Sequence, residues 1–216
     1  NRLNYLKLNS IIKVVALLGG FMLQYTGWHG TTNKRKERIL SSGFSYKKYE
    51  PGIEKQRHPN DLGNGIYFFL PFQQDSGKSI ASAYVSKYKS SELKAPGVKP
   101  ALIRADIAVD TQKNIFDLDD PQNQRLLEEF RQTAKAEIEK EVAQIPDSGA
   151  KNRANLLNQN QGLIIELLLD LASSHGIIYK AVQSKTYSDL PFLPIFDAKN
   201  GNEICIRDLD CIKNIL

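Results

Sequence analysis

The chain has 216 residues, of which 41% are hydrophobic and 25% are charged. These values are ordinary for a globular protein with a sizeable core, and they argue against extensive disorder. The net charge is +5 at pH 7. Because the basic excess is spread thinly along the sequence, it is weak evidence for any one partner. The chain begins with Asn1 rather than Met, and we expect it to be a fragment of a longer protein.

Cys205 and Cys211 are the only cysteines. No histidine lies near them, so we expect neither a zinc site nor a disulfide framework. Two reduced thiols indicate a reducing, cytoplasmic-type compartment. The most apolar segment, 11–23, is shorter than the ~20 residues that cross a bilayer. We therefore expect a buried element and no stable membrane insertion, with a membrane-proximal segment as the alternative.

Hydrophobic spacing and turn residues predict the following elements of the N-terminal half. They are a helix over 3–18, a strand over 21–28, a helix over 32–42 closed by Gly43, a polar loop over 45–64, a strand over 65–70, a helix over 79–88 and a strand over 101–109. The helix over 32–42 would bury Ile39 and Leu40. Its basic residues would form a solvated face or, because the helix start lies close to residues 27–32, contact a phosphate.

The C-terminal half is predicted to contain two helices and three short strands. The helices cover 124–145 and 156–176, with a linker over 145–155 between them. The strands cover 176–182, 192–198 and 203–209, and Asn200-Gly201 indicates a hairpin turn before the last. Strands at both ends with helices between them predict one α+β domain over 1–216, whose first and last strands meet in one sheet.

Three stretches stand out for their chemistry. They are GWHGTT at 27–32, LGNGIYFF at 62–69 followed by IASAYV at 80–85, and NEICIRDLDCI at 202–212. Each has a plain structural reading when taken alone. His29 would be a hydrogen-bonded structural histidine, Tyr67 a core residue and Glu203 a solvated hairpin carboxylate. The two glycines around His29 nevertheless suggest a tight turn that receives a ligand.

Taken together and in this order, the three stretches resemble the ADP-ribosyltransferase superfamily, in the branch shared by diphtheria-type toxins and the poly(ADP-ribose) polymerases. The resemblance covers about half of the chain, over 27–44, 62–84 and 176–213. It implies an ADP-ribosyltransferase-like split antiparallel β-sheet core with flanking helices. Within this single catalytic domain, the block 117–175 would be a helical insertion that selects the target.

The resemblance also implies the roles of individual residues. Glu203, His29 and Tyr67 would be catalytic, and His29, Gly30, Thr31, Tyr67 and Tyr84 would bind NAD+, the substrate, without any metal. Nicotinamide leaves NAD+ as a neutral molecule through an oxocarbenium-like transition state, which a fixed carboxylate stabilises. Two aromatic rings can hold the nicotinamide by offset stacking.

The chain departs from the family pattern near Tyr84. The loop between Tyr67 and Tyr84 is longer than in the relatives, and Ala81 stands where the polymerases have serine. The residues still favour a mono-ADP-ribosyltransferase that moves ADP-ribose from NAD+ to a macromolecular acceptor, a protein in preference to nucleic acid. An NAD+ glycohydrolase and a catalytically silent binding module are the alternatives. RNA 2′-phosphotransferases share the fold but use further arginines and a second histidine that have no counterpart here. By analogy, such an enzyme is typical of a secreted bacterial effector or toxin.

Overall fold

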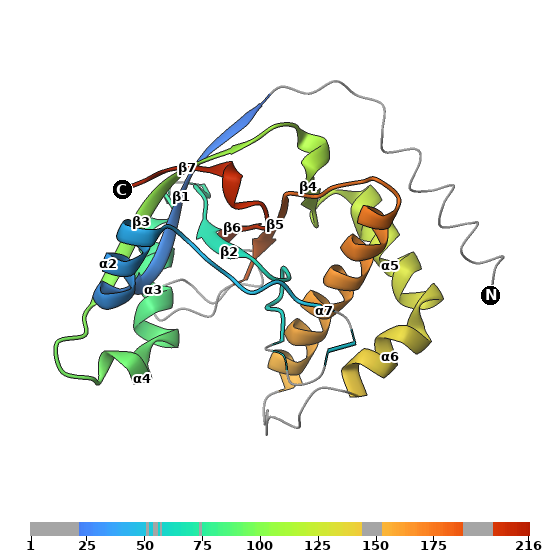
Figure 1. Ribbon diagram of the computed structural model, residues 1–216, viewed down its shortest axis with the longest axis horizontal. Helices are drawn as coiled ribbons and strands as arrows, with labels where there is room; N and C mark the ends of the chain where they lie inside the picture. Colours follow the sequence, from blue (N-terminus) through green and yellow to red (C-terminus); the bar gives the residue numbers. More distant parts are fainter. Residues whose placement is uncertain are drawn as a thin grey trace.

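The fold is a seven-stranded mixed β-sheet with helices packed on it, an α+β architecture (Figure 1). The computed structural model describes residues 22–50, 52–53, 56, 58–73, 75–143, 153–187 and 201–216, with the side chains of 143 and 153–159 left out. The strands are β1 Leu23–Thr32, β2 Ile66–Phe69, β3 Pro100–Val109, β4 Ile115–Asp117, β5 Ala181–Thr186, β6 Gly201–Ile206 and β7 Ile212–Ile215. The α-helices are α2 Asn33–Ser42, α3 Lys78–Tyr88, α4 Ser90–Leu93, α5 Pro121–Thr133, α6 Lys135–Ala143 and α7 Arg153–Ser174.

The strands follow the order β4-β5-β6-β2-β1-β3-β7 across the sheet. All neighbouring strands are antiparallel except β4 and β5, which are parallel. The α+β class is therefore confirmed, and the sheet is mixed rather than antiparallel throughout. The first and last strands that the sequence predicted correspond to β1 and β6, and they share the sheet with β2 between them.

In the centre of the sheet, β1 and β2 are paired at a single position. β1 pairs with β3 along its whole length, from Leu23↔Val109 to Thr32↔Pro100. On its other side, β1 pairs with β2 only at Trp28↔Phe69. Beyond that pair the backbones of β1 and β2 no longer form a ladder, and polar backbone groups there need other partners.

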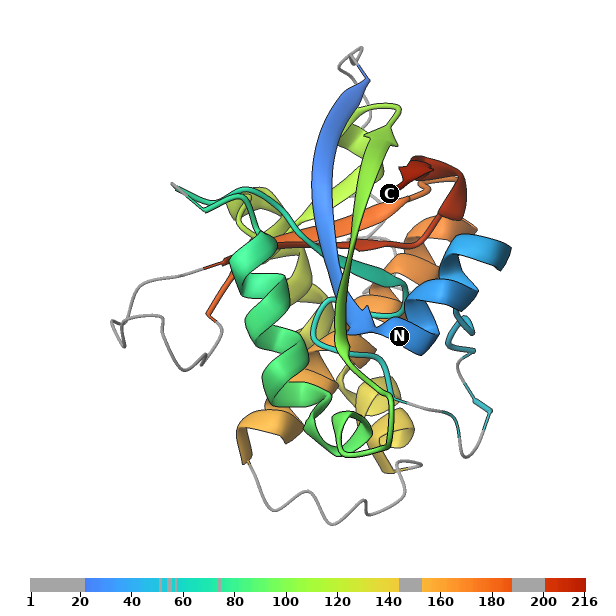
Figure 2. The same cartoon turned by 90° about the vertical axis from the view of Figure 1, so that its left-hand side faces the viewer.

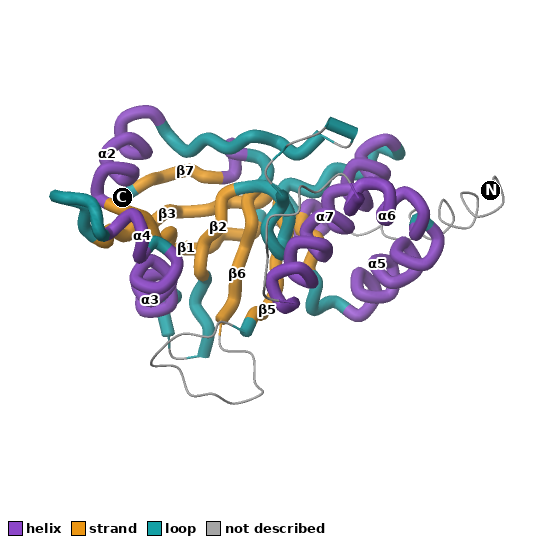
Figure 3. The backbone as a smooth tube through the Cα atoms, turned by 90° about the horizontal axis from the view of Figure 1, so that it is seen from below, coloured by secondary structure: helices purple, strands orange, loops and turns teal. Residues whose placement is uncertain are grey.

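Both faces of the sheet are buried by different segments. On one face, α3 covers Phe69 with Ile80, Ala81 and Ala83, while α5 and α7 pack over a cluster that includes Phe116, Val182 and Cys205. The other face buries alternate residues of the same strands, such as Phe68, Ile107 and Ile204, beneath Tyr25, Phe44 and Tyr46. Figures 2 and 3 show α2 and α3 on opposite sides of β1 and β3.

The helices α5–α7 share their core with the sheet. Leu126, Leu127 and Phe130 of α5 and Ile165 and Leu168 of α7 belong to one buried cluster with strand residues. Among the described helices, none is both long enough and apolar enough to cross a membrane. In Figure 1, α5–α7 lie at one end of the molecule and α2–α4 at the other.

Several element predictions are corrected by the structure. Leu40 is 50% exposed, so the predicted inner face of α2 is wrong at that position. The single helix expected over 124–145 is divided at Ala134 into α5 and α6. The break directly follows Thr133, whose hydroxyl donates to the carbonyl of Glu129 at 2.8 Å, a bond that competes with regular helix geometry. The strand expected over 176–182 begins only at Ala181, and β4 and β7 were not expected. The predicted helix over 3–18, the strand over 192–198 and its hairpin turn lie outside the described residues.

Candidate active site

The stretch GWHGTT lies within strand β1, so the expectation of a tight turn is wrong. Its glycines are explained by close packing of the protein on itself. A Cβ atom on Gly27 would lie 2.8 Å from Cβ of Phe68, and one on Gly30 would meet the carbonyl of Ala81 and lie 2.6 Å from Cγ2 of Val85. Both distances are too short for real side chains, so glycine lets β2 and α3 approach β1.

The side chain of His29 makes a hydrogen bond to β2 directly after the single β1–β2 backbone pair. Its Nδ1 lies 2.9 Å from the carbonyl oxygen of Tyr67. A carbonyl only accepts, so Nδ1 carries the hydrogen and donates it. The ring makes edge contacts with Phe44 and Phe68, with centroids 5.2 and 5.9 Å apart. Burial lowers the pKa of His29, and the positive charges of Lys89 and Arg35 lower it further, against the hydrogen bond to Tyr67, which raises it. At neutral pH the imidazole is therefore uncharged, and its Nε2 is an acceptor.

The side chain of Tyr67 is fixed by the packing of its ring and by the hydrogen bonds of its hydroxyl. The ring packs against the cluster beneath α5 and α7. The hydroxyl donates to the carbonyl of Gly63 at 2.8 Å and accepts from the backbone N–H of Leu62 at 3.0 Å. Burial is the main reason that the pKa of Tyr67 lies well above its ordinary value; electrostatic interactions with Cys205, Asp61 and Glu203 raise it further, against the hydrogen bond from Leu62, which lowers it. The phenol stays protonated, and its position is fixed by the turn that precedes β2.

Glu203 is a nearly buried carboxylate on the central strand β6, with 9% of its surface exposed. The hydroxyl of Thr186, at the end of β5, lies 2.7 Å from its Oε1 and donates to it. A hydrogen bond to an ionised carboxylate is short and strong and fixes the orientation of the group. Thr186 was not singled out from the sequence, because the expected strand ended at residue 182.

The sheet register decides which of these side chains share a face. Tyr67 lies opposite Cys205 and Phe69 lies opposite Glu203, so Tyr67 and Glu203 project from the same face of neighbouring strands. Trp28 lies opposite Phe69 and extends this row to β1. His29, the next residue, therefore points to the other face, where its ring meets Phe68. The structure thus brings Tyr67 and Glu203 together, whereas His29 joins them only through the Tyr67 carbonyl.

The remaining expected binding residues lie around this centre. Tyr84, on α3, has its ring 5.6 Å from that of Phe69 and 4.9 Å from that of Tyr88. Gly30 and Thr31 are buried in the part of β1 that follows its one pair with β2 and remains paired with β3. Tyr84 therefore reaches the face that carries Tyr67 and Glu203, though its own ring contacts are with Phe69 and Tyr88.

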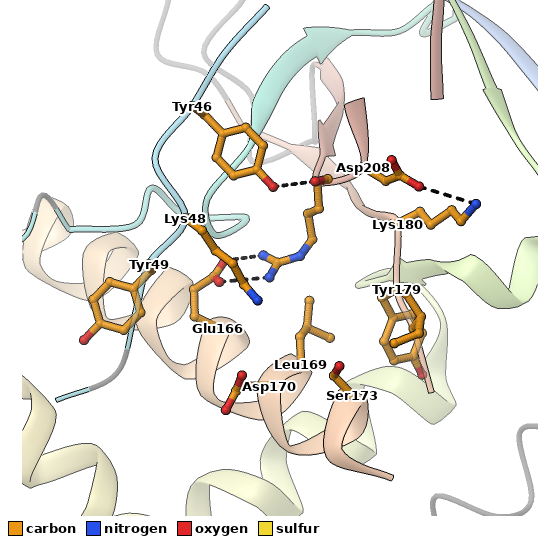
Figure 4. A pocket seen from close by; sticks show the side chains of 12 residues that line it. Tyr46, Lys48, Tyr49, Glu166, Leu169, Asp170, Ser173, Tyr179, Lys180 and Asp208 are labelled. Atoms are coloured by element: carbon orange, nitrogen blue, oxygen red, sulfur yellow. Dashed lines mark hydrogen bonds and ion pairs between the residues drawn. The ribbon is translucent and has the colours of Figure 1, made fainter. Parts of the chain in front are cut away.

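A pocket of about 300 Å³ lies elsewhere, between α7, the end of β6 and the loop after Phe44 (Figure 4). Its floor is the ion pair of Arg207 and Glu166, whose side chains are 12% and 3% exposed. Nη2 of Arg207 lies 2.9 Å from Oε2 of Glu166, and Nη1 contacts Oε1. At the rim, Lys180 pairs with Asp208 at 3.4 Å. Because these charges neutralise one another, the pocket has no evident preference for a charged ligand.

Within the described ranges, no group of three or more histidine, cysteine, aspartate or glutamate side chains is placed to hold a metal ion. Cys205 and Cys211 are free thiols, and burial raises the pKa of both, that of Cys211 to about 11. They are thus protonated at neutral pH.

No protein family model, no curated protein and no solved structure matches this chain.

Proposed function

We propose that the chain is a mono-ADP-ribosyltransferase, which cleaves NAD+, releases nicotinamide and transfers ADP-ribose to a macromolecule. The observation that supports it most is the pairing of Glu203 with Thr186 beside Tyr67 on one sheet face. The carboxylate is recessed and oriented before any substrate arrives. Preorganised negative charge of this kind is what an oxocarbenium-like transition state requires.

Glu203 would act on the ribose that carries nicotinamide. As the glycosidic C–N bond breaks, its electron pair goes to the nicotinamide ring, which leaves uncharged, and positive charge develops at the ribose carbon. The carboxylate stabilises that charge. It can also orient an acceptor hydroxyl or amine and take its proton as the new bond to the ribose carbon forms.

The tyrosines would hold the nicotinamide ring. Tyr67 is fixed through its hydroxyl, and Tyr84 projects from the helix that covers the same sheet face. An aromatic ring held rigidly loses little conformational entropy when a flat ligand stacks on it. The two side chains have separate ring contacts in the free protein, which is compatible with a ligand ring between or beside them.

His29 would recognise a ribose hydroxyl. Its Nδ1–H is committed to the Tyr67 carbonyl, and its lowered pKa keeps Nε2 unprotonated at neutral pH. Nε2 can then accept a hydrogen bond from a hydroxyl but not from a phosphate, which has no proton to give. Gly30 and Thr31 would contribute backbone groups beside it, since the β1 backbone after Trp28 lacks a β2 partner.

An NAD+ glycohydrolase, with water as the acceptor, would use the same residues. A catalytically silent binding module would bind NAD+ without turning it over. The decisive experiment is incubation of the chain with NAD+ labelled in the adenylate half, with and without a cell lysate. Label on a macromolecule supports transfer, free ADP-ribose alone supports the glycohydrolase, and no nicotinamide release supports the silent module.

A further inference from the structure

The charge of this protein is segregated in the fold, although it looks evenly spread in the sequence. The stretches 33–42 and 78–99, which contain α2, α3 and α4, hold nine lysines and arginines against two glutamates. The stretch 117–143, which contains α5 and α6, holds eight acidic residues against four basic ones. Because these groups of helices lie at opposite ends of the molecule (Figure 1), the protein has a basic pole and an acidic pole.

Most charges of the basic pole are not neutralised by the protein. Glu92 pairs with Arg35 at 2.9 Å and with Lys89 at 3.5 Å, which ties α2 to α4. Within the described residues, Lys34, Lys94 and Lys99 have no ion pair, and all three are exposed. An exposed surface of one sign attracts a polyanion and concentrates it locally.

Helix α3 adds aromatic rings to this basic surface. Tyr88 is 54% exposed, and Nζ of Lys87 lies 5.3 Å from the centre of its ring. At the other end of α3, Nζ of Lys78 lies 5.2 Å from the centre of the Trp28 ring. Lysines interleaved with aromatic side chains are typical of surfaces that bind single-stranded nucleic acid, where phosphates meet cations and bases stack on rings.

The position of α3 relates this surface to the candidate active site. Trp28, Phe69 and Glu203 lie in one row across the sheet, and Gly77, at the start of α3, packs against the carbonyl of Phe69, so the start of α3 lies over this row. Ten residues of helix, about 15 Å, separate Lys78 from Tyr88, the length of a few nucleotides. Since Glu203 is only 9% exposed, a base inside a duplex could not reach it without being flipped out.

We infer that the surface of α3, α4, the segment 94–99 and the first turn of α2 binds single-stranded nucleic acid and presents it to Glu203 as the acceptor. Hydrogen bonds of Asn33 with Gly97 and Lys99 hold that first turn, which carries Lys34, beside the segment 94–99. This inference rests on the proposed function and replaces the protein acceptor that the sequence alone favoured. In the transfer, the C–N bond to nicotinamide breaks with its electron pair on nicotinamide. A lone pair of the nucleic acid forms the new bond, and an acceptor hydroxyl or amine passes its proton to Glu203.

Binding can be measured without NAD+ by fluorescence anisotropy of a labelled 12-nucleotide single strand, as DNA and as RNA of one sequence. The variant Lys34→Glu/Lys94→Glu/Lys99→Glu should bind at least tenfold more weakly. The slope of log affinity against log salt should shrink by about 2, at roughly 0.7 for each lost phosphate contact. Tyr88→Ala should weaken binding about tenfold with little change of slope. Arg125→Glu/Lys135→Glu/Lys140→Glu, with the same charge change at the acidic pole, is the matched control and should bind like the parent.

The outcomes separate this inference from the proposed function. Glu203→Gln should bind the strand normally, because the docking surface does not include the carboxylate. Parent protein that releases nicotinamide but does not bind either strand overturns the docking surface and leaves the enzyme intact. Equal binding to vesicles with anionic lipid or to polyglutamate overturns it in favour of a membrane or an acidic protein. Binding of the strand with label transferred only to protein overturns nucleic acid as the acceptor.

Discussion

Replacing Thr186 with valine tests how the carboxylate of Glu203 is positioned. The change keeps the β-branched shape and the backbone pairing of Thr186 with Gly201, and it removes the 2.7 Å hydrogen bond to Oε1. A hydrogen bond to a charged group contributes about 1.5–3 kcal/mol, and water replaces it poorly at a side chain that is 9% exposed. If that restraint acts in the transition state, kcat should fall about 10- to 100-fold. KM for NAD+ should stay near the parent value, because Thr186 acts through Glu203.

Nicotinamide release under initial-rate conditions gives kcat and KM separately. Thr186→Ser is the matched control, since serine retains the hydroxyl and should recover most of the rate. Thermal unfolding of each variant establishes that the protein is folded at the assay temperature. A folded Thr186→Val protein that turns over at the parent rate refutes the reasoning, and so does a Thr186→Ser protein that is as slow as valine.

Further predictions concern Tyr67, His29 and the ion pair of Arg207 and Glu166. Tyr67→Phe should lower the free energy of unfolding by about 1–3 kcal/mol, because the backbone groups of residues 62 and 63 lose their hydrogen-bond partner, and it should leave NAD+ affinity unchanged. Tyr67→Ala should weaken NAD+ binding by roughly 1–3 kcal/mol. Calorimetry that finds equal affinity for Tyr67→Ala and the parent removes Tyr67 from the site. The folded state holds His29 neutral at a lowered pKa. Below pH ~6.5 the imidazole is therefore protonated in the unfolded state before it is in the folded state, and the free energy of unfolding decreases as the pH is lowered. Urea titrations of parent and His29→Asn at pH 7 and pH 5 should show the larger loss in the parent, and equal losses would contradict this. Arg207→Met should lower the free energy of unfolding by about 3–5 kcal/mol, because it leaves the charge of Glu166 buried without its partner. Arg207→Met/Glu166→Met should lower it by less. A double variant as unstable as the single one argues against a charge effect.

Elements whose pattern is local could be predicted from the sequence. The spacing of Ile80, Ala81 and Val85 identifies α3, and all three are buried. Gly43 ends α2 with a φ of 78°, which glycine adopts without strain. The alternation of β3 is also visible in the sequence, because Ile103, Ala105 and Ile107, at every second position, are buried in the core.

The parts that could not be predicted depend on long-range pairing. The strand β4 has three residues and exists because it pairs with β5, more than 60 residues away. The two glycines around His29 are the same residues that a turn would need, and only the approach of Phe68 and Val85 explains them as strand positions. Thr186 and Glu203 are separated by 17 positions, and no spacing rule connects their side chains.

The family resemblance pointed to Tyr67, Glu203 and His29, and the fold places only the first two on the same face of the sheet. Tyr67 and Glu203 were proposed from separate stretches, and the register of β2 and β6 places them on one face. His29 lies in the predicted region, but the alternation of β1 turns its ring to the other face. Sequence motifs identify which residues to consider together, and the strand register determines the face of the sheet on which each side chain lies.

Glu203→Gln tests the central claim most directly. The substitution keeps the size of the side chain and removes its charge, so NAD+ should bind with near-parent affinity by calorimetry. Nicotinamide release in a single turnover should fall by about 10²–10³, the usual effect of losing one preorganised electrostatic group. A folded Glu203→Gln protein that releases nicotinamide at the parent rate would contradict the assignment of Glu203 as the catalytic carboxylate.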